Sequence, residues 1–329
     1  MHDHPAAADY ARLTPDILLA AVDTLGYRTS GQLLALNSYE NRVYQVGLED
    51  AAPLIVKFYR PNRWSDAAIL EEHSFTQELA EHEIPVVAPL QSAQATLHRH
   101  EGYRYAVYPR QGGHWPELGS RDERLWMGRF IGRIHAVCAA RPFEHRPALD
   151  IDSFGLRPSR FLLEGGFLPA HIETAYSTLV SDLLDQVGSC FNRAGRMTRI
   201  RLHGDCHPGN ILWTDDGPHF VDLDDCRSGP AIQDLWMLLS GDRQEMQLQL
   251  GELLEGYQQF HDIDYRELQL IEALRTLRMI HYAAWLARRW DDPAFPRAFP
   301  WFNTPRYWED HILALREQAD LLQQPPLAV

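Results

Sequence analysis

The sequence predicts an α+β protein made of two lobes, a small antiparallel β-sheet lobe followed by a larger, mainly helical one. Short apolar runs broken by turns recur between residues 31 and 60, whereas helical periodicity prevails beyond residue 110. A chain of 329 residues, 45% of them hydrophobic, can also bury more than one core. We therefore expect an N-terminal lobe over residues 1–110 and a C-terminal lobe over residues 111–329.

Charge and composition exclude several classes of protein. The formal net charge of −14 at pH 7 disfavours binding to nucleic acid or to an anionic membrane. The four cysteines include no C-x-x-C pair, so neither a disulfide framework nor a zinc knuckle is indicated. No secretory leader is recognisable, and no apolar run approaches the roughly 18 residues of a membrane span. A soluble, cytoplasmic monomer without a membrane or nucleic-acid partner is expected.

The N-terminal lobe is predicted to begin with a helix and three strands. Thr14 can cap a helix that Gly26 ends. Alternating apolar residues then predict short strands at 34–36, 43–46 and 54–59. The second helix of the lobe, beyond these strands, follows the cap residue Ser65 and runs to about Glu81.

Two positions in these strands suggest phosphate binding. The polar turn Asn37–Asn41 contains Ser38, whose hydroxyl can contact a phosphate, but it contains no glycine, and a plain hairpin is the alternative. Lys57 interrupts an apolar strand, as does the lysine that holds the α- and β-phosphates in protein kinases. A buried ammonium needs a partner, which Glu72 or Glu71 of the following helix can supply. The alternative is an edge-strand lysine beside a solvated helix face.

The chain between the lobes is predicted to form a hairpin and a hinge. Residues 96–108 read as two strands around Glu101-Gly102. The following segment Tyr108–Gly113 can offer backbone N–H and C=O groups to an adenine edge. Helices are then expected at 122–140, where His135 is interpreted as a core histidine, at 182–194 and at 268–290.

The stretch Arg201–Asp225 has the clearest chemistry. It contains His-Gly-Asp-Cys-His-Pro-Gly-Asn, an H-x-D-x-x-x-x-N pattern with the spacing that protein kinases use for a catalytic aspartate and a metal-binding asparagine. Asp205 can take a proton from a substrate hydroxyl. Asn210 offers an amide oxygen to Mg²⁺, and Asp222, which ends an apolar strand, offers a carboxylate. The stretch therefore predicts phosphoryl transfer from ATP, with Asp205 and Asp222 as catalytic residues and Asn210 and Asp222 as magnesium ligands.

Other interpretations of this stretch stay open. Asp224 is a second possible metal ligand, because Leu-Asp replaces the Phe-Gly that follows the metal-binding aspartate of protein kinases. His203, Cys206 and His207 could bind zinc, although the spacing places no fourth ligand. The acidic run at 222–225 could also be only a solvated turn.

The stretch His203–Asp225, with Gly-Pro-Ala-Ile-Gln-Asp-Leu at 229–235, resembles the aminoglycoside phosphotransferase and choline kinase superfamily. Residues 36–44, 204–213 and 274–290 resemble more specifically the bacterial stress response kinase A family, and the similarity spans nearly the full chain. The resemblance implies a protein-kinase-like bilobal fold with an αC-type helix in the N-lobe. It also implies an ATP- and Mg²⁺-dependent serine/threonine protein kinase that can phosphorylate itself and acts in stress responses.

Carried over residue by residue, the resemblance implies the same roles. Asp205 corresponds to the proton acceptor, and Asn210 and Asp222 correspond to the magnesium ligands. Ser38 matches an ATP-contacting position, and Lys57 matches the phosphate-binding lysine.

The resemblance further implies that Asp234 braces the catalytic loop through backbone N–H groups. The absence of a glycine-rich loop, of Asp-Phe-Gly and of Ala-Pro-Glu departs from protein kinases and leaves the substrate class open. The alternatives are a kinase of small alcohols, of the aminoglycoside, choline or homoserine kind, and a nucleotide-binding pseudokinase.

A protein substrate is favoured by the resemblance and by charge. Four arginines lie on the predicted helix 268–290: Arg275, Arg278, Arg288 and Arg289. Near a phosphoryl-transfer cleft, arginines can hold an acidic peptide or a phosphate product, and the alternative is a solvated basic helix face.

Overall fold

The computed structural model describes residues 10–329, and the structural statements below concern that part of the chain. The chain divides into two compact units. Unit 1 consists of Met1–Glu117, Phe143–Arg146 and Pro208–Cys226, and unit 2 of Leu118–Pro142, Pro147–His207 and Arg227–Val329. Unit 1 thus includes a late segment that carries Asn210 and Asp222. The assignment of lobes to residues 1–110 and 111–329 stays a prediction.

Unit 1 contains a five-stranded antiparallel sheet in the order β1-β2-β3-β5-β4. Its strands are β1 (Thr29–Ala35), β2 (Arg42–Leu48), β3 (Leu54–Phe58), β4 (His98–His100) and β5 (Tyr103–Pro109). Lys57 lies on the inner strand β3, opposite Val43 of β2 and Ala106 of β5. The predicted antiparallel sheet is confirmed, and the alternative of an edge-strand lysine is wrong.

The hairpin of β4 and β5 turns at the two residues that the sequence suggested. Glu101 and Gly102 have φ angles of 47° and 82°. A two-residue turn with both φ angles positive follows the right-handed twist of the strands, and a glycine at its second position meets that requirement without a steric cost.

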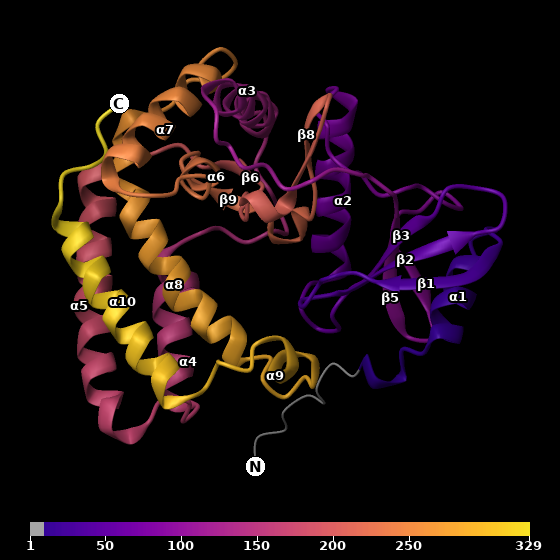
Figure 1. Cartoon of the computed structure of the whole chain (residues 1–329), viewed down its shortest axis with the longest axis horizontal. Helices are drawn as coiled ribbons and strands as arrows, with labels where there is room; N and C mark the ends of the chain where they lie inside the picture. Colours follow the sequence, from indigo (N-terminus) through magenta and orange to yellow (C-terminus); the bar gives the residue numbers. More distant parts are fainter. Residues whose placement is uncertain (1–9) are drawn as a thin grey trace. The chain divides into compact units, whose positions relative to one another are not determined.

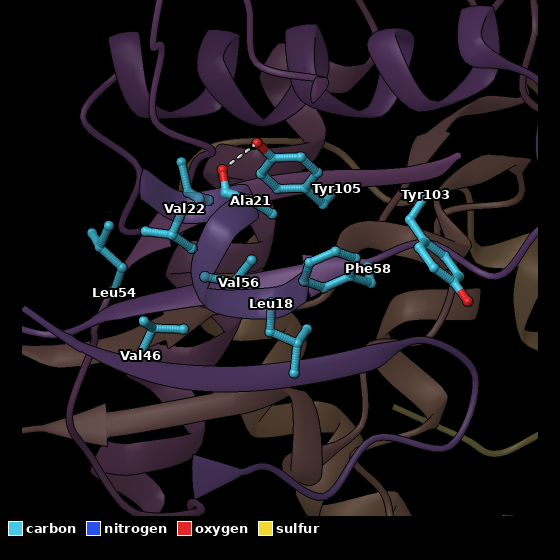
Figure 2. Packing of buried hydrophobic residues seen from close by; sticks show 10 residues of the cluster. Leu18, Ala21, Val22, Val46, Leu54, Val56, Phe58, Tyr103 and Tyr105 are labelled. Atoms are coloured by element: carbon cyan, nitrogen blue, oxygen red, sulfur yellow. Dashed lines mark hydrogen bonds between the residues drawn. The ribbon is translucent and has the colours of Figure 1, made fainter. Parts of the chain in front are cut away.

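The core of unit 1 lies between the sheet and helix α1 (Pro15–Asp23), which begins after Thr14 as predicted. Figure 2 shows Leu18 and Val22 of this helix beside Val56 of β3. The Tyr105 hydroxyl, from the neighbouring strand β5, donates a hydrogen bond of 2.6 Å to a backbone carbonyl of α1. The buried hydroxyl is thereby satisfied, and the helix is fixed in position against the strands.

Two further elements of unit 1 position polar side chains. Helix α2 (Asp66–Glu81) begins where Ser65 accepts a hydrogen bond from the Ala68 amide at 3.1 Å, as the predicted cap requires. Strands β7 (Ile211–Thr214) and β8 (Gly217–Phe220) form an antiparallel hairpin. Glu72 lies on α2. Asn210 directly precedes β7, and Asp222 follows the end of β8 by two residues.

Unit 2 is mainly helical, as predicted. Its helices are α3 (Arg121–Cys138), the π-helical turn η2 (Asp152–Leu156), α4 (Arg157–Glu164), α5 (Ala170–Ala194), α6 (Gln233–Trp236), α7 (Arg243–Tyr257), the 3₁₀ helix η5 (Tyr265–Leu270), α8 (Ile271–Ala287), α9 (Ala294–Ala298) and α10 (Pro305–Gln323). Helices α5, α8 and α10 pack on one another (Figure 1). Strands β6 (Ile200–Leu202) and β9 (Arg227–Gly229) form an antiparallel pair.

The predicted helices of unit 2 are confirmed, with corrected limits. The helix expected at 182–194 is the second half of α5, which begins at Ala170. The helix expected at 268–290 divides into η5 and α8. Among the helices of residues 10–329, none combines the length and the apolar character that a bilayer crossing requires.

Helices α3 and α7 approach closely because glycines lie between them. A Cβ atom on Gly128 or Gly132 would overlap with a backbone carbonyl of α7, and a Cβ on Gly256 would overlap with the carbonyl of Leu125 in α3. Gly251, in the same helix α7, has nothing within 4 Å of the position that a Cβ would take. Of these four glycines, the three at the α3–α7 interface are therefore required for packing and Gly251 is not.

This contrast gives a matched test of the α3–α7 interface. We expect Gly256→Ala to lower the free energy of unfolding by about 1–3 kcal/mol or more, because backbone must shift to admit the methyl group. Gly251→Ala should raise it by about 0.5–1 kcal/mol, because alanine is the better helix former. Urea unfolding midpoints decide the matter, and equal shifts of the same sign would contradict the packing analysis.

Candidate active site

A cleft of about 400 Å³ lies in unit 1. Five residues that the sequence singled out line it together: Ser38, Lys57, Glu72, Asn210 and Asp222. Apolar side chains line the rest of it, among them Leu36, Val43, Ile55, Val87, Leu212, Val221 and Leu223. The hinge residues Tyr108, Pro109 and Gln111 also line the cleft, and so does Trp115, which the sequence did not indicate. One cleft thus combines an apolar wall with a few convergent polar groups, the usual composition of a ligand site.

Lys57 is the cation at the base of this cleft and is only 5% exposed. Its ammonium lies 3.0 Å from Oδ1 of Asp222, 3.5 Å from Oε1 of Glu72 and 3.5 Å from Oδ1 of Asp224. Burial acts to lower the pKa of Lys57, but the carboxylates of Asp222, Asp224 and Glu72 raise it well above its usual value. The lysine therefore stays charged, as phosphate binding requires.

Glu72 and not Glu71 is the helix residue that faces Lys57. Burial raises the pKa of Glu72 to about 7, and Lys57 only partly opposes this effect. The neighbouring Glu71 points elsewhere and accepts hydrogen bonds of 2.6, 2.8 and 2.8 Å from the backbone amides of Glu144, His145 and Arg146. The two glutamates thus have separate tasks, and the register of α2 is fixed by both.

Asn210 and Asp222 lie at the same end of the β7–β8 hairpin. The amide of Val221 donates to the carbonyl of Asn210 at 3.0 Å, which continues the pairing of the two strands by one step. Asp222 then adopts a left-handed conformation, with φ 58°, which asparagine and aspartate tolerate better than most residues. Its carboxylate is half-exposed in the cleft and lies close to Lys57. Two hard oxygen ligands are thereby brought together.

This donor set fits magnesium and not zinc. An amide oxygen and a carboxylate are the ligand types that Mg²⁺ takes together with phosphate oxygens and water. In the described chain, no group of three or more His, Cys, Asp and Glu side chains could hold a metal ion by itself. Cys206, the thiol in the alternative zinc set, is buried, and burial raises its pKa well above the usual range. Asn210 and Asp222 are therefore the lining residues that could hold Mg²⁺.

Asp224 contacts several of the charged and polar side chains around it and is only 2% exposed. Its carboxylate contacts Arg63 and Lys57, and it accepts a hydrogen bond of 3.1 Å from the side-chain amide of Asn41. Burial acts to raise the pKa of Asp224, but Arg63 and Lys57 hold it below its usual value. The acidic run 222–225 is therefore more than a solvated turn.

Through Asn41, Asp224 reaches the turn that contains Ser38. Inside the turn, the Ser38 hydroxyl donates to the carbonyl of Asn41 at 3.2 Å, and the hydrogen bond from Asn41 to Asp224 joins the turn to the segment after β8. Arg63 adds a second link, because it lies 3.5 Å from Glu40 of the turn and also binds Asp224 and, at 2.8 Å, Asp225. The sequence did not indicate Asn41 or Arg63, which lie 183 and 161 residues from Asp224.

Asp205 belongs to unit 2, and four residues of chain separate it from Asn210 in unit 1. The loop before it is held by Asp234 of α6, whose carboxylate accepts hydrogen bonds from the amides of His203 at 2.8 Å and Gly204 at 2.9 Å. The contact predicted for Asp234 is thus confirmed. It removes the conformational freedom of the two residues directly before Asp205.

Two residues that the sequence did not single out for the site support Asp234. Nε2 of His135 lies 3.2 Å from the Asp234 carboxylate, and its Nδ1 lies 2.9 Å from the Tyr257 hydroxyl. His135 is fully buried, so the prediction of a core histidine is confirmed, but the side chain also touches the brace. Glu267 accepts a hydrogen bond of 2.9 Å from the Ile232 amide at the start of α6, and burial raises its pKa to about 7.

Asp205 itself is flanked by two basic side chains. Arg278 of α8 contacts Oδ1, and Nε2 of His207 lies 3.5 Å from Oδ2. The other arginines of the predicted helix have different partners: Arg275 binds Glu272, Arg288 lies over Phe161 and Arg289 lies over Trp285. Of the four arginines, only Arg278 reaches the aspartate.

The sequence matches the model of the family described as "Phosphotransferase enzyme family" over residues 32–271. Over 321 residues it is 44% identical to the protein named stress response kinase A of Salmonella choleraesuis (strain SC-B67), which covers 98% of this chain and 97% of that protein. With the same identity and coverage it is similar to the protein named serine/threonine protein kinase RdoA of Salmonella typhimurium (strain LT2).

Two solved structures share the fold. An amicoumacin kinase, described in complex with AMP-PNP and Ca²⁺, gives a TM-score of 0.75 at 20% identity over 97% of this chain and 96% of that chain. An aminopropanol kinase gives a TM-score of 0.68 at 17% identity over 94% of this chain and 97% of that chain. On the match to the family and the extent of the similarity to the curated relatives, the chain belongs to the phosphotransferase enzyme family, in the group of the stress response kinase A proteins.

Proposed function

We propose that this phosphotransferase is an ATP- and Mg²⁺-dependent serine/threonine protein kinase that phosphorylates itself as well as other proteins and serves a stress response in the cytoplasm. The observation that supports it most is the cleft of unit 1, in which Lys57, Asn210 and Asp222 face the same space. A charged lysine and two hard oxygen ligands are the parts that an ATP-dependent phosphotransferase needs on the nucleotide side. The curated relative named a serine/threonine protein kinase supports the protein substrate.

In this proposal, different side chains of the cleft bind different parts of the nucleotide. Lys57 binds phosphate oxygens, and Ser38 contributes a hydroxyl from the turn above it. The adenine lies against the apolar wall near Tyr108 and Gln111, where backbone groups are available. Asn210 and Asp222 hold Mg²⁺. The chemistry that a bound Mg²⁺ supplies is neutralisation and alignment of the phosphates.

Asp205 acts on the acceptor. It takes the proton of the acceptor hydroxyl while that oxygen forms its bond to the γ-phosphorus of ATP. The bond from this phosphorus to the bridging oxygen breaks, and ADP leaves with the electron pair. The proton later passes from Asp205 to solvent. Asp234 and His135 do not touch the reactants and are positioning residues, because they hold the backbone before Asp205.

A kinase of small alcohols is the second candidate, and the names of the solved neighbours favour it, since they are an amicoumacin kinase and an aminopropanol kinase. The deciding experiment follows ³²P from ATP into the purified protein, into generic proteins and into a panel of small alcohols. Labelling of the protein itself and of generic proteins is expected. Phosphorylation of a small alcohol without labelling of any protein would replace the first proposal by the second.

Asp205→Asn tests the base. We expect turnover to fall by about two to four orders of magnitude, the usual contribution of a positioned general base, while the KM for ATP changes little. Asp215→Asn, in the exposed turn between β7 and β8, is the matched control and should behave as the wild type. Turnover of Asp205→Asn within threefold of the wild type would remove this role.

Asn210→Ala and Asp222→Ala test the metal site. Each removes one oxygen ligand, so the Mg²⁺ concentration for half-maximal activity should rise at least about tenfold, a loss that even outer-shell partners of metals can cause. Magnesium titrations at saturating ATP measure it. An unchanged magnesium requirement in both variants would show that neither residue holds the ion.

Asn41→Ala and Asp224→Asn test the tether between the Ser38 turn and the metal segment. Asn41→Ala deletes the link without removing a charge, so the KM for ATP should rise about tenfold, the equivalent of a hydrogen bond to a charged group. Because Asn41 is buried and also accepts a hydrogen bond of 3.0 Å from the Arg60 amide, the variant should also lower the free energy of unfolding by about 1–3 kcal/mol. Asp224→Asn removes one of the carboxylates that neutralise the buried side chains of Lys57 and Arg63. It should therefore also lower the free energy of unfolding by about 3–5 kcal/mol.

Asp225→Asn is the control for this pair, because Asp225 also binds Arg63 but its side chain is 34% exposed. Its effect on the KM for ATP should be small. If Asp224→Asn lowers the thermal midpoint while Asn41→Ala and Asp224→Asn both keep the wild-type KM for ATP, the cluster is structural and does not position the turn.

A further inference from the structure

The proposed base is covered on both of its oxygens by basic side chains of its own unit. Arg278 contacts Oδ1 of Asp205, and His207 stands 3.5 Å from Oδ2. A general base must accept a hydrogen bond from the hydroxyl that it deprotonates. A carboxylate oxygen has a limited number of acceptor sites, so a hydroxyl that approaches Oδ1 competes with the Arg278 guanidinium for this oxygen.

The ion pair of Arg278 and Asp205 is weak enough for Arg278 to exchange its partner. The side chains of Arg278 and Asp205 are 36% and 23% exposed, so water screens the pair. Ion pairs that are exposed to this extent contribute little to the free energy of folding. A second anion close to Arg278 can therefore replace Asp205 as its partner, because the guanidinium keeps a charge-assisted hydrogen bond in either arrangement.

Arg278 is suited to this exchange, whereas the other three arginines of the segment 268–290 are not. Arg275 is one turn earlier and binds Glu272 at 3.1 Å. Arg288 and Arg289 lie over aromatic rings at 5.0 Å. These three arginines have partners away from Asp205, so Arg278 is the arginine of this segment that acts on the proposed base.

A second guanidinium, that of Arg227, is in contact with a ring that packs against α8. Arg227 of β9 lies 4.6 Å from the ring of Phe154, and that ring stacks on His281 with 4.3 Å between the centroids. His281 follows Arg278 by three residues, which puts the two on neighbouring positions of the α8 surface. Arg227 is thus connected to the part of α8 that carries Arg278 through the stacked rings of Phe154 and His281.

We propose that Arg278 selects acceptors with a negative charge beside the reacting hydroxyl, such as a serine or threonine next to an acidic residue. The acceptor anion takes the guanidinium from Asp205, and the freed oxygen then takes the hydroxyl proton. An acceptor with a positive charge near its hydroxyl is repelled by Arg278 and leaves the base covered. The inference rests on the proposed protein kinase function and names the substrate class of that site.

The test uses three serine peptides of equal length, whose flanking residues are acidic, neutral or basic. For the wild type, kcat/KM should be roughly tenfold higher for the acidic peptide than for the neutral one, the effect of one charge-assisted hydrogen bond. Arg278→Gln should bring this ratio close to one and should raise kcat for the neutral peptide, because the base is no longer covered. Arg278→Glu should invert the preference towards the basic peptide.

Arg275→Gln is the matched control and should keep the wild-type ratio. Ratios that are the same in the wild type and both Arg278 variants would overturn the inference, as would an equal loss of kcat for all three peptides in Arg278→Gln. The second outcome would mean that Arg278 only supports the loop.

The failure of the proposed function gives a different result. If no peptide is phosphorylated, the protein kinase proposal fails, and the same ratio is measured with a small hydroxy acid and a small amino alcohol. A preference for the hydroxy acid that Arg278→Gln removes would keep the inference. A preference for the amino alcohol that is independent of Arg278, or no transfer to either compound, would overturn it.

Discussion

The burial of Lys57 constrains the rest of unit 1. An ammonium on an inner strand is tolerated only with carboxylates around it, because an uncompensated charge in the interior costs several kcal/mol. Asp222, Asp224 and Glu72 supply this charge, and they come from the segment after β8 and from α2. The lysine therefore fixes the register of α2 and the path of the chain after the hairpin. The same contacts hold the proposed metal ligand Asp222 in the cleft.

Unit 2 uses a different device for the proposed base. Asp205 lies in an irregular loop, which has no ladder of its own to hold it. Asp234 replaces the ladder by accepting two backbone hydrogen bonds, and His135 and Glu267 hold Asp234 and the start of its short helix. Because these supporting groups are buried, they are satisfied by one another and not by water. The loop before Asp205 is thus held by Asp234. Asp234 is held in turn by His135 and by the start of α6, which Glu267 fixes.

The sequence was sufficient for the parts of this arrangement that are local. Periodicity predicted the strands and α2, and the H-x-D-x-x-x-x-N spacing marked the loop of Asp205 and Asn210. The family resemblance supplied Asp234. Asn41, Arg63 and Glu267 were missed, because their partners lie far away in the chain and no periodic pattern encodes such pairs. His135 was interpreted only as a core residue. In the sequence, a histidine that supports Asp234 and one that merely fills the core occupy the same kind of position on an apolar helix face.

Two departures from the pattern of protein kinases have one physical explanation in unit 1. The turn at residues 37–41 has no glycine, and Asp224 stands where those kinases have the glycine after the metal-binding aspartate. A glycine at the second position could not hold Asn41, and without Asn41 the turn would lose its link to the metal segment. In the proposed function, the carboxylate of Asp224 would take over a task that a glycine-rich turn performs with its own backbone, namely the placement of phosphate-binding groups. The two residues should therefore be understood as a pair, because a glycine at 224 would free a turn that has no glycines of its own to bind the phosphates.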